Sequence, residues 1–321
     1  MKIFVTGGSG FVGKHLIPYL VERGHTVIAM GRSAGASDSL RKLGAQPIQG
    51  DLEQFDQSLQ DALTGCDIVI HLAAAFQMWG DEDWFYRVNV TGTRKLLEMS
   101  QNANVKRFIY VSAASVIAGG IPAHQVDETY RPPHLPDDVY SKTKALAEKL
   151  VIDANSSAMQ TMALRPPLIW GKGHFMLNAV RQAVARHQWV WIGGGRHKLS
   201  TIHVLNLCEA ICAAMQFGRG GECYFVTDGP AHTTRTFLSY WLSAEGISSN
   251  GPNVPRFLAL SMARVVETCW RWFNLHGEPP LTPAMVYMLG TELTVNDSKA
   301  RAQLHYQNVV PADLGSYTGR A

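Results

Sequence analysis

The sequence predicts an α/β fold: a doubly wound parallel sheet followed by a smaller, mostly helical C-terminal region. Three observations predict it. Short apolar runs alternate with amphipathic helical segments over the first 170 residues. A glycine-rich turn follows the first apolar run, and the alternation weakens after Trp170. The chain has 321 residues, of which 46% are hydrophobic and 17% charged, so it is long enough for one large core and a second region.

The expected elements follow one another in β–α–β order. Strands are predicted at 3–7, 25–32, 46–52, 67–74, 106–113 and 160–170. Helices are predicted at 11–24, 55–63, 90–103 and 140–155, where apolar residues recur every three or four positions. Such an order predicts parallel strands with helices on both faces of the sheet.

The second half of the chain is less regular. We expect a helix within 171–198, a strand leading into a helix at 200–217, and a further strand within 221–229. The remainder is predicted to be helical, with breaks at prolines. We therefore predict one domain at 1–170, to which 199–228 return, and a second region made of 171–198 and 229–321.

Composition excludes several classes of function. The net charge is +3 and no basic run is present, so nucleic acid is not an expected partner. The histidines and the five scattered cysteines lack metal-ligand spacing, and no GxSxG motif indicates a serine hydrolase. Free cysteines, no charged leader and no long apolar run predict a reducing, cytoplasmic location.

The turn TGGSGFVG at 6–13 predicts a dinucleotide site of the Rossmann type. Gly7 allows a tight turn after the strand, Gly10 lets a pyrophosphate approach the backbone, and Gly13 lets the helix pack close to the sheet. Unpaired N–H groups at the helix N-terminus favour the phosphates. Further cofactor contacts are expected from the neighbouring Ser9, Phe11 and Val12.

The end of the second strand bears on the choice of cofactor. It reads Met30-Gly31-Arg32-Ser33 and has no carboxylate to accept hydrogen bonds from a ribose 2′-OH. Arg32 and Ser33 instead suit a 2′-phosphate. We therefore predict NADP, with NAD as the alternative.

Tyr140 and Lys144 are predicted to be the catalytic pair. They are four residues apart and share one face of a helix. The tyrosine OH exchanges a proton with a carbonyl or alcohol oxygen, and the nearby ammonium is expected to lower the pKa of the tyrosine.

The ordered motifs resemble the extended short-chain dehydrogenase/reductase superfamily. They are TGGSGFVG (6–13), GDL (50–52), HLAA (71–74), NVTGT (89–93), YSKTK (140–144) and LRP (164–166). Later segments are similar to the 3β-hydroxysteroid dehydrogenase branch, which also holds bacterial reductases of long-chain β-keto or β-hydroxy acids. They are ALRPPLIWGKG (163–173), STIHVLNL (200–207), GECYFVTDG (221–229), EPPLTP (278–283) and NDSKARAQLHY (296–306).

The resemblance implies roles for further residues. Asp51 and Leu52 hold the adenine, Lys144 also binds the nicotinamide ribose, and Pro166 and Leu168 border the nicotinamide. The remaining cofactor-side residues that it implies are Leu72, Ala73, Ala74, Val111 and Asn89, the last with a structural role as the alternative. The superfamily often forms dimers through helices like 90–103 and 140–155, so a homodimer is expected.

The stretch YVSAASV at 110–116 departs from the family pattern. The family usually places Ser or Thr at the position of Ala113, where the hydroxyl donates to the substrate oxygen. If the strand stays extended, 111, 113 and 115 share a face, so Ser115 is the expected substitute and Ser112 a weaker one. Outright loss of such a donor costs ~3 kcal/mol.

The substrate side is predicted to be apolar. Aromatic and thioether side chains are frequent there: Phe76, Met78, Trp79, Trp84, Phe175, Met176, Trp189 and Trp191. Most of them are expected to fill the core. The amphipathic segment 254–275 is expected to be a packed helix, and three other roles stay open: covering the substrate entrance, contacting another subunit, or lying on a membrane surface.

The leading hypothesis is an NAD(P)-dependent oxidoreductase that interconverts a secondary alcohol and a ketone on a sterol-like substrate or a β-hydroxy or β-keto acid. One alternative is a nucleotide-sugar epimerase or dehydratase. The other is a catalytically weak NADP-binding protein, because Ala113 replaces the usual hydroxyl.

Overall fold

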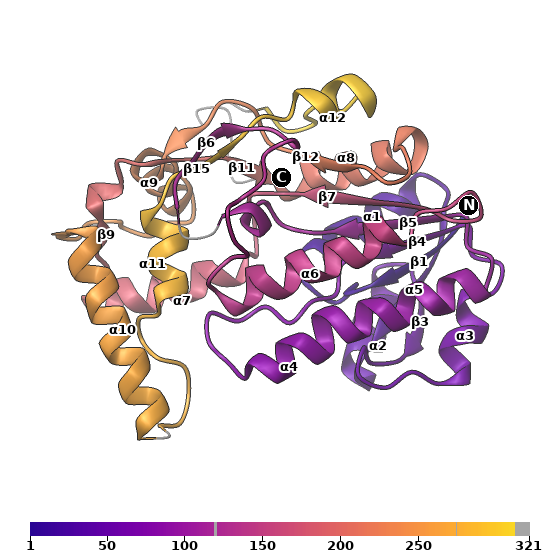
Figure 1. Cartoon of the computed structure of the whole chain (residues 1–321), viewed down its shortest axis with the longest axis horizontal. Coiled ribbons are helices and arrows are strands. Elements are labelled where there is room, and N and C mark those ends of the chain that lie inside the picture. Colours follow the sequence, from indigo (N-terminus) through magenta and orange to yellow (C-terminus); the bar gives the residue numbers. More distant parts are fainter. Residues whose placement is uncertain (119–120, 274, 312–321) are drawn as a thin grey trace.

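The central element of the molecule is a parallel sheet. The computed structural model describes residues 1–118, 121–273 and 275–311. Within them, seven strands lie in the order β12-β7-β5-β4-β1-β2-β3, all parallel (Figure 1). Their bounds are β1 Lys2–Thr6, β2 Thr26–Gly31, β3 Gln46–Gln49, β4 Ile68–His71, β5 Arg107–Val111, β7 Gln160–Arg165 and β12 Cys223–Phe225. The chain winds outward from β1 first to one edge and then to the other, so the predicted fold class is confirmed.

Helices cover both faces of this sheet. One face packs against α1 (Phe11–Glu22), α2 (Ala34–Lys42) and α8 (Val204–Phe217). The other packs against α3 (Gln57–Leu63), α5 (Gly92–Asn102) and α6 (Val139–Asp153). Ile3 and Val5 belong to the first core and Phe4 to the second, because successive strand residues point to opposite faces.

Several expected boundaries were wrong, and local chemistry explains one of them. The predicted strand 160–170 is broken into β7 and β8 (Leu168–Trp170) at Pro166 and Pro167, which have no N–H for a strand ladder. The predicted strand 106–113 ends at Val111, and Ala114–Ile117 form a 3-10 turn. The unpredicted α4 (Glu82–Tyr86) and a π-helical turn (Arg87–Thr91) precede α5.

The C-terminal region combines helices with a small sheet that periodicity did not predict. Strands of two to four residues pair there in the order β13-β10-β15-β6. The strand bounds are β6 Ala123–Val126, β9 Trp191–Ile192, β10 Lys198–Leu199, β11 Thr201–His203, β13 His232–Thr233, β14 Asn253–Val254 and β15 Leu293–Val295. The helix bounds are α7 Phe175–Ala185, α9 Thr234–Ala244, α10 Arg256–Trp272, α11 Pro283–Gly290 and α12 Ser298–Gln303. Residues 312–321 of the predicted substrate region, and residue 274 of segment 254–275, lie outside the described residues.

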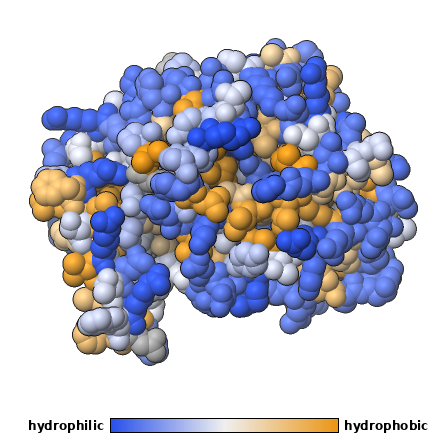
Figure 2. All heavy atoms as spheres, in the orientation of Figure 1, coloured by the Kyte–Doolittle hydropathy of each residue, from blue (hydrophilic) through white to orange (hydrophobic). Residues whose placement is uncertain are grey.

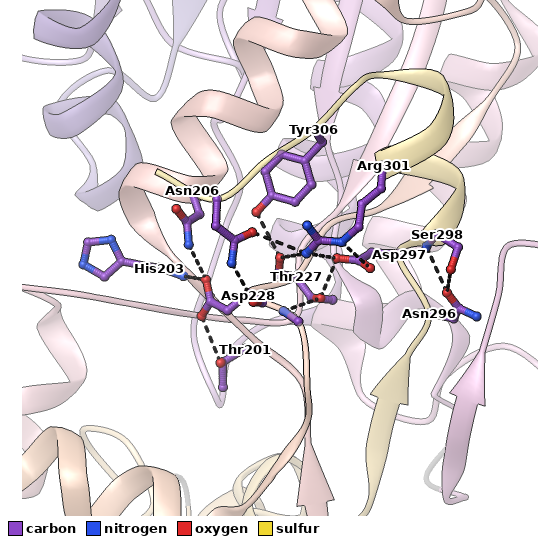
Figure 3. Close-up of polar contacts among 12 residues, drawn as sticks. Thr201, His203, Asn206, Thr227, Asp228, Asn296, Asp297, Ser298, Arg301 and Tyr306 are labelled. Atoms are coloured by element: carbon purple, nitrogen blue, oxygen red, sulfur yellow. Dashed lines mark hydrogen bonds and ion pairs between the residues drawn. The ribbon is translucent and has the colours of Figure 1, made fainter. Parts of the chain in front are cut away.

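A buried carboxylate anchors this second region to the end of the sheet (Figure 3). Asp228 accepts hydrogen bonds from the indole of Trp170 (2.6 Å), the backbone N–H of His203 (2.7 Å) and the amide of Asn206 (2.7 Å). Asn206 in turn accepts from the backbone N–H groups of Val309 and Val310. Trp170 belongs to β8, whereas His203 and Asn206 lie at the start of α8. The carboxylate, with Asn206, therefore holds β8, α8 and the segment at Val309 and Val310 in one arrangement.

Three further features of the structure concern membrane-spanning helices, metal-binding groups and the cysteines. In the part of the chain that the structure describes, no helix is long and apolar enough to cross a bilayer. The same part contains no group of three or more His, Cys, Asp or Glu residues placed to hold a metal ion. Cys208 and Cys212 are buried in the core.

The close contact of α1 with the glycine turn gives a testable prediction. A Cβ on Gly13 would lie 2.4 Å from the backbone of Gly8, which cannot move aside as a side chain would. We expect Gly13→Ala to lower the free energy of unfolding by roughly 2–3 kcal/mol, measured by urea denaturation. Gly35→Ala is the matched control, because Gly35 is helical and a Cβ there meets nothing within 4 Å. It should stabilise by about 0.4–1 kcal/mol, and equal effects of the two changes would contradict the prediction.

Candidate active site

The glycine turn after β1 forms a cradle for a diphosphate. Gly7 has φ +70°, and a Cβ on it would lie 2.7 Å from the backbone nitrogen of Ala73. Gly10 begins α1 without a capping side chain, and the first turn of α1 has no acidic residue. The N–H groups of that turn and the positive end of the helix dipole therefore suit an anion, and the residues fit the pyrophosphate of a dinucleotide.

A chain of hydrogen bonds holds the loop opposite this turn. Thr93 donates to the carbonyl of Asn89 (2.6 Å), so its oxygen accepts from Nε2–H of His71 (2.9 Å). The Nδ1 atom of His71 then accepts from the hydroxyl of Thr6 (2.7 Å), and Thr6 accepts from the N–H of Ala73 (3.2 Å). Burial lowers the pKa of His71 to about 3, so the ring stays neutral and keeps this tautomer.

Asn89 connects the same loop to the start of α6. Its side chain accepts from the N–H of Ala75 (2.7 Å) and donates to the hydroxyl of Thr143 (3.0 Å). Asn89 is buried and does not line the cavity described below, so these contacts fit the structural alternative for it. Thr143 lies beside Lys144. Thr143 and Thr93 belong to the motifs YSKTK and NVTGT, but the sequence patterns gave neither residue a role.

Tyr140 and Lys144 lie on the face of α6 that is directed to the end of β5. The side chain of Lys144 is buried, donates to the carbonyl of Val111 (2.7 Å), and lies 4.1 Å from the ring centre of Tyr110. The ring of Tyr140 is half-buried and packs edge-to-face on Phe76, with ring centres 4.7 Å apart. Both side chains line one cavity.

The pKa of Tyr140 does not follow the expectation that the ammonium of Lys144 lowers it. Burial, and then the charge of Asp138, raise the pKa of Tyr140 instead of lowering it. Burial lowers the pKa of Lys144 from 10.5 to about 7, although the charge of Glu148 raises it. Burial disfavours both the phenolate of Tyr140 and the ammonium of Lys144. This effect outweighs the attraction between the two charges that the four-residue spacing led us to expect.

The hydroxyl donors near Tyr140 come from a turn and not from a strand. Because the strand ends at Val111, the extended geometry expected for 111, 113 and 115 was wrong. Ser112, Ala113 and Ser115 nevertheless all line the cavity. The hydroxyl of Ser141 donates to that of Ser115 (2.8 Å), which leaves the hydrogen of Ser115 for another acceptor. The hydroxyl of Ser112 is buried and has no hydrogen-bond partner.

These groups surround one cavity of about 770 Å³, a size usual for small-molecule sites. It brings together eleven of the residues predicted for the cofactor: Gly7, Gly10, Phe11, Val12, Leu72, Ala74, Val111, Tyr140, Lys144, Pro166 and Leu168. The cavity extends from the glycine turn past Tyr140 to α10 and α11.

The other predicted cofactor residues do not line this cavity. Gly13 acts in packing, as described above, and Ser33 caps α2 by accepting from the N–H of Ala36 (3.2 Å). Asp51 accepts from the N–H of Glu53 (3.0 Å), and Leu52 is buried beside Gly92. The remaining three are Ser9 and Ala73, both half-buried, and Arg32, which is exposed. Their predicted contacts with a cofactor stay predictions.

The far side of the cavity is rich in apolar groups. Phe76, Met78, Trp79, Phe175 and Met176 line it, so the expectation that most of the listed aromatic and methionine residues fill the core was wrong. Trp189 and Trp191 are core residues whose indoles donate to the carbonyl of Ser249, and Trp84 packs on Phe85. His174, unassigned by the sequence, also lines the cavity, and burial lowers its pKa to about 4, so it is uncharged at neutral pH.

The buried lysine predicts a pH-dependent stability. Between about pH 7 and pH 10 the unfolded chain holds the Lys144 proton and the folded chain releases it, so this group raises the free energy of unfolding as pH rises. We expect the wild type to gain stability over Lys144→Met across that window, by at most about 1.4 kcal/mol per pH unit. Urea denaturation at several pH values measures it. The exposed Lys149 provides the control variant Lys149→Met, and parallel profiles for all three proteins would refute the prediction.

Solved structures share this fold. A dTDP-glucose 4,6-dehydratase from Streptomyces venezuelae, solved with NAD, has a TM-score of 0.75 and 21% identity over 100% of this chain and 96% of that one. A UDP-glucuronic acid 4-epimerase from Bacillus cereus in complex with NAD has a TM-score of 0.73 and 21% identity over 97% of this chain and 95% of that one. At these identities the likeness shows the fold alone.

Sequence relatives are more specific. The chain is 39% identical over 316 residues to a 4-hydroxy-2-methyl-3-oxo-4-farnesyl-3,4-dihydroquinoline-1-oxide ketoreductase of Stigmatella aurantiaca, which covers 98% of this chain and 94% of that protein. It is 33% identical to a decarboxylating sterol-4-alpha-carboxylate 3-dehydrogenase of Dictyostelium discoideum, over 98% of both chains. It is 31% identical to a 2-alkyl-3-oxoalkanoate reductase of Stenotrophomonas maltophilia (strain K279a), over 98% and 97%. Residues 4–256 also match the sequence profile of one family, and the chain therefore belongs to the 3-beta hydroxysteroid dehydrogenase/isomerase family.

Proposed function

We propose that this chain reduces a ketone, or oxidises the corresponding secondary alcohol, on a substrate with a large apolar body, with NADP as its cofactor. Its family and relatives make it an NAD(P)-dependent dehydrogenase or reductase. The observation that carries the proposal is the common cavity, which joins the glycine cradle, Tyr140 with Lys144, and an apolar far side.

Tyr140 is the acid and base of the reaction. In the reductive direction its hydroxyl donates a proton to the carbonyl oxygen of the substrate, and in the oxidative direction it removes one from the alcohol. A high pKa keeps the phenol protonated at neutral pH, which suits the reductive direction. Phe76 holds the ring at the cavity wall. The bound cofactor supplies the hydride at its nicotinamide C4.

Ser115 supplies the second hydrogen bond to the same oxygen. Ser141 donates to Ser115 and thereby leaves the Ser115 hydrogen free to point into the cavity. Ser112, on the other side of Ala113, also lines the cavity, but its hydroxyl is fully buried. The missing hydroxyl at Ala113 therefore has one neighbour, Ser115, that can replace it, and this favours a working enzyme over a cofactor-binding protein without activity.

The substrate is a ketone or hydroxy compound beside a ring system or a long chain. Phe76 packs on Tyr140 and Phe175 packs on Phe76, and both line the cavity together with Met176. Charged side chains occur toward the rim, where Lys142 pairs with Glu82 (2.8 Å) and Arg271 with Glu267 (3.0 Å). A nucleotide-sugar diphosphate would need unpaired polar groups along this wall, so an epimerase or dehydratase is the weaker candidate.

Other expectations from the sequence accompany the proposal. Residues 1–170 with 199–228 form the cofactor domain, and 171–198 with the rest of the C-terminal region form the substrate side. A homodimer and a cytoplasmic location stay predictions.

Removing the Tyr140 hydroxyl, which is the proton donor, and removing the Ser115 hydroxyl, which is the hydrogen-bond donor, should each lower kcat, and the two effects can be measured separately. Tyr140→Phe should lower kcat by about 10²–10⁴-fold because it removes the proton donor. Ser115→Ala should lower kcat by roughly 10²-fold, because its hydrogen bond is strongest as charge develops on the oxygen. The measurement is oxidation of NADPH with 2-alkyl-3-oxoalkanoates and keto-steroids. The competing class is tested by incubation with NAD and UDP-glucose and analysis of the sugar product, because an epimerase or dehydratase regenerates its cofactor and shows no net oxidation.

Ser58→Ala is the matched serine control, because Ser58 is exposed, hydrogen bonds only locally to Asp56, and does not line the cavity. It should leave kcat unchanged. Full activity of Tyr140→Phe would exclude the mechanism. A Ser115→Ala effect on KM alone would exclude the donor role.

The cofactor choice is tested at Arg32. Arg32→Ala should reduce the preference for NADPH over NADH in kcat/KM by roughly tenfold to a hundredfold, the strength of a charge-assisted hydrogen bond. Arg41→Ala provides a nearby exposed arginine that is paired with Asp38 and should change nothing. A wild-type preference for NADH, or equal behaviour of the two variants, would contradict the assignment of NADP.

A further inference from the structure

His174 presents a polar group on the cavity wall that the proposed mechanism does not use. It is the N-cap residue of α7 and is only 7% exposed. It lines the cavity next to Phe175 and Met176, whose side chains are apolar. The cap alone does not require a histidine, because Ser, Thr, Asp and Asn are the residues that helix starts prefer. A second role for this side chain is therefore indicated.

The hydrogen bonding of the imidazole leaves one N–H without an acceptor. Nδ1 accepts from the backbone N–H of Met176 (3.2 Å), so this nitrogen carries no proton. Burial lowers the pKa of His174 to about 4, so the ring is neutral at neutral pH and its proton is on Nε2. In the part of the chain that the structure describes, no group accepts from Nε2, and unlike the hydroxyl of Ser112 this nitrogen is not sealed off by protein. The N–H is therefore available to a ligand in the cavity.

Aromatic rings hold the imidazole in place. Its ring centre lies 4.6 Å from that of Phe11, 4.4 Å from that of Phe175 and 5.6 Å from that of Trp241. Phe11 and Trp241 meet it edge to face, an arrangement that aromatic pairs favour. A ring packed in this way has little freedom left to lose when a ligand binds, so its N–H is preorganised.

The contact with Phe11 places His174 beside the glycine cradle. Phe11 is the first residue of α1, whose first-turn N–H groups belong to the cradle. In the other direction, Phe175 packs on Phe76, which packs on Tyr140. His174 therefore lies on the wall between the cradle and the proton donor, with Phe11 alone between it and the cradle.

The surroundings of the cradle offer a diphosphate few other side-chain donors. The residues of the turn and of the helix start that line the cavity have no polar side chain: Gly7, Gly10, Phe11 and Val12. In the described part of the chain, the cations that line the cavity lie on α6 and α10: Lys142, Lys144, Arg264 and Arg271. Hydrophobic residues also gather on the outer surface over α6 (Figure 2). A phosphate oxygen directed away from the helix start thus faces a mainly apolar wall, on which His174 is a donor.

We propose that the Nε2–H of His174 donates a hydrogen bond to a diphosphate oxygen of the bound dinucleotide. The cradle belongs to β1 and α1, whereas His174 begins α7 of the substrate side, so this bond ties the substrate side to the cofactor. The diphosphate is common to NAD and NADP, and the assignment is the same for both. It rests on the proposed function only in requiring a dinucleotide, and the identity of the ketone plays no part in it.

The experiment measures dissociation constants of the full chain by calorimetry. The ligands are NADPH or NADH, whichever the wild type binds more tightly, and the matching fragment without nicotinamide, ADP-ribose 2′-phosphate or ADP-ribose. His174→Asn keeps an oxygen that can cap α7 but removes the Nε2–H. We expect it to bind both ligands at least about tenfold more weakly than the wild type, because a hydrogen bond to a charged group is lost. His174→Gln returns an amide N–H near the position of Nε2, so it should bind both ligands more tightly than His174→Asn, although loss of the cap should lower its urea midpoint.

His187→Asn is the matched control. His187 is exposed, does not line the cavity, and has φ +57°, a conformation that asparagine adopts readily. This variant should bind both ligands as the wild type does. Because the titrations need no turnover, a chain that binds the dinucleotide but reduces no ketone would count against the proposed reaction and not against the role of His174.

Four results would overturn the assignment. If His174→Asn binds both ligands as tightly as the wild type, the histidine only caps α7. If it loses affinity for the intact dinucleotide alone, the acceptor lies in the nicotinamide half and not in the diphosphate. If the affinities follow the urea midpoints of the variants and not the presence of a donor, the effect is structural. If the wild type binds no dinucleotide, the proposed function fails together with this inference.

Discussion

The hydrogen bond from Lys144 to the carbonyl of Val111 is the contact on which the geometry of the site depends. It joins α6 to the carboxyl end of β5, across the edge of the sheet where the loops meet. A buried ammonium is costly unless it is hydrogen bonded, so this lysine has one well-defined position. Tyr140 lies one turn earlier on the same helix, and its place at the cavity wall follows from that of the lysine.

The loops that face this helix are held by neutral hydrogen bonds. Thr6, His71 and Thr93 connect β1, β4 and α5, and Asn89 extends the connection to Thr143 on α6. A charged histidine would break the pattern, because Nδ1 must accept from Thr6. The low pKa of His71 therefore keeps the crevice unchanged over the pH range in which Lys144 titrates.

The sequence predicted the sheet and the common position of Tyr140 and Lys144 on one helix face, because both depend on local patterns. Apolar runs and glycine spacing mark β1 to β5 and β7, and the four-residue spacing of Tyr140 and Lys144 needs only a helix. Three features escaped because they depend on tertiary contacts. The small sheet has strands of two to four residues, which are too short for periodicity to detect. The pKa of Tyr140 is governed by burial, and the chain leaves the strand at Val111 although its apolar pattern continues.

That early end of β5 explains how Ala113 can be accommodated in an enzyme of this family. In an extended strand Ser112 would face away from Ala113, and only Ser115 would share its side. The chain instead enters a 3-10 turn at Ala114–Ile117, and both Ser115, on that turn, and Ser112, before it, line one cavity. Ser115 gains a fixed partner in Ser141, while Ser112 stays buried without one. Ser115, half-buried and held by Ser141, is therefore the better placed of the two hydroxyls to take over the role of the missing donor.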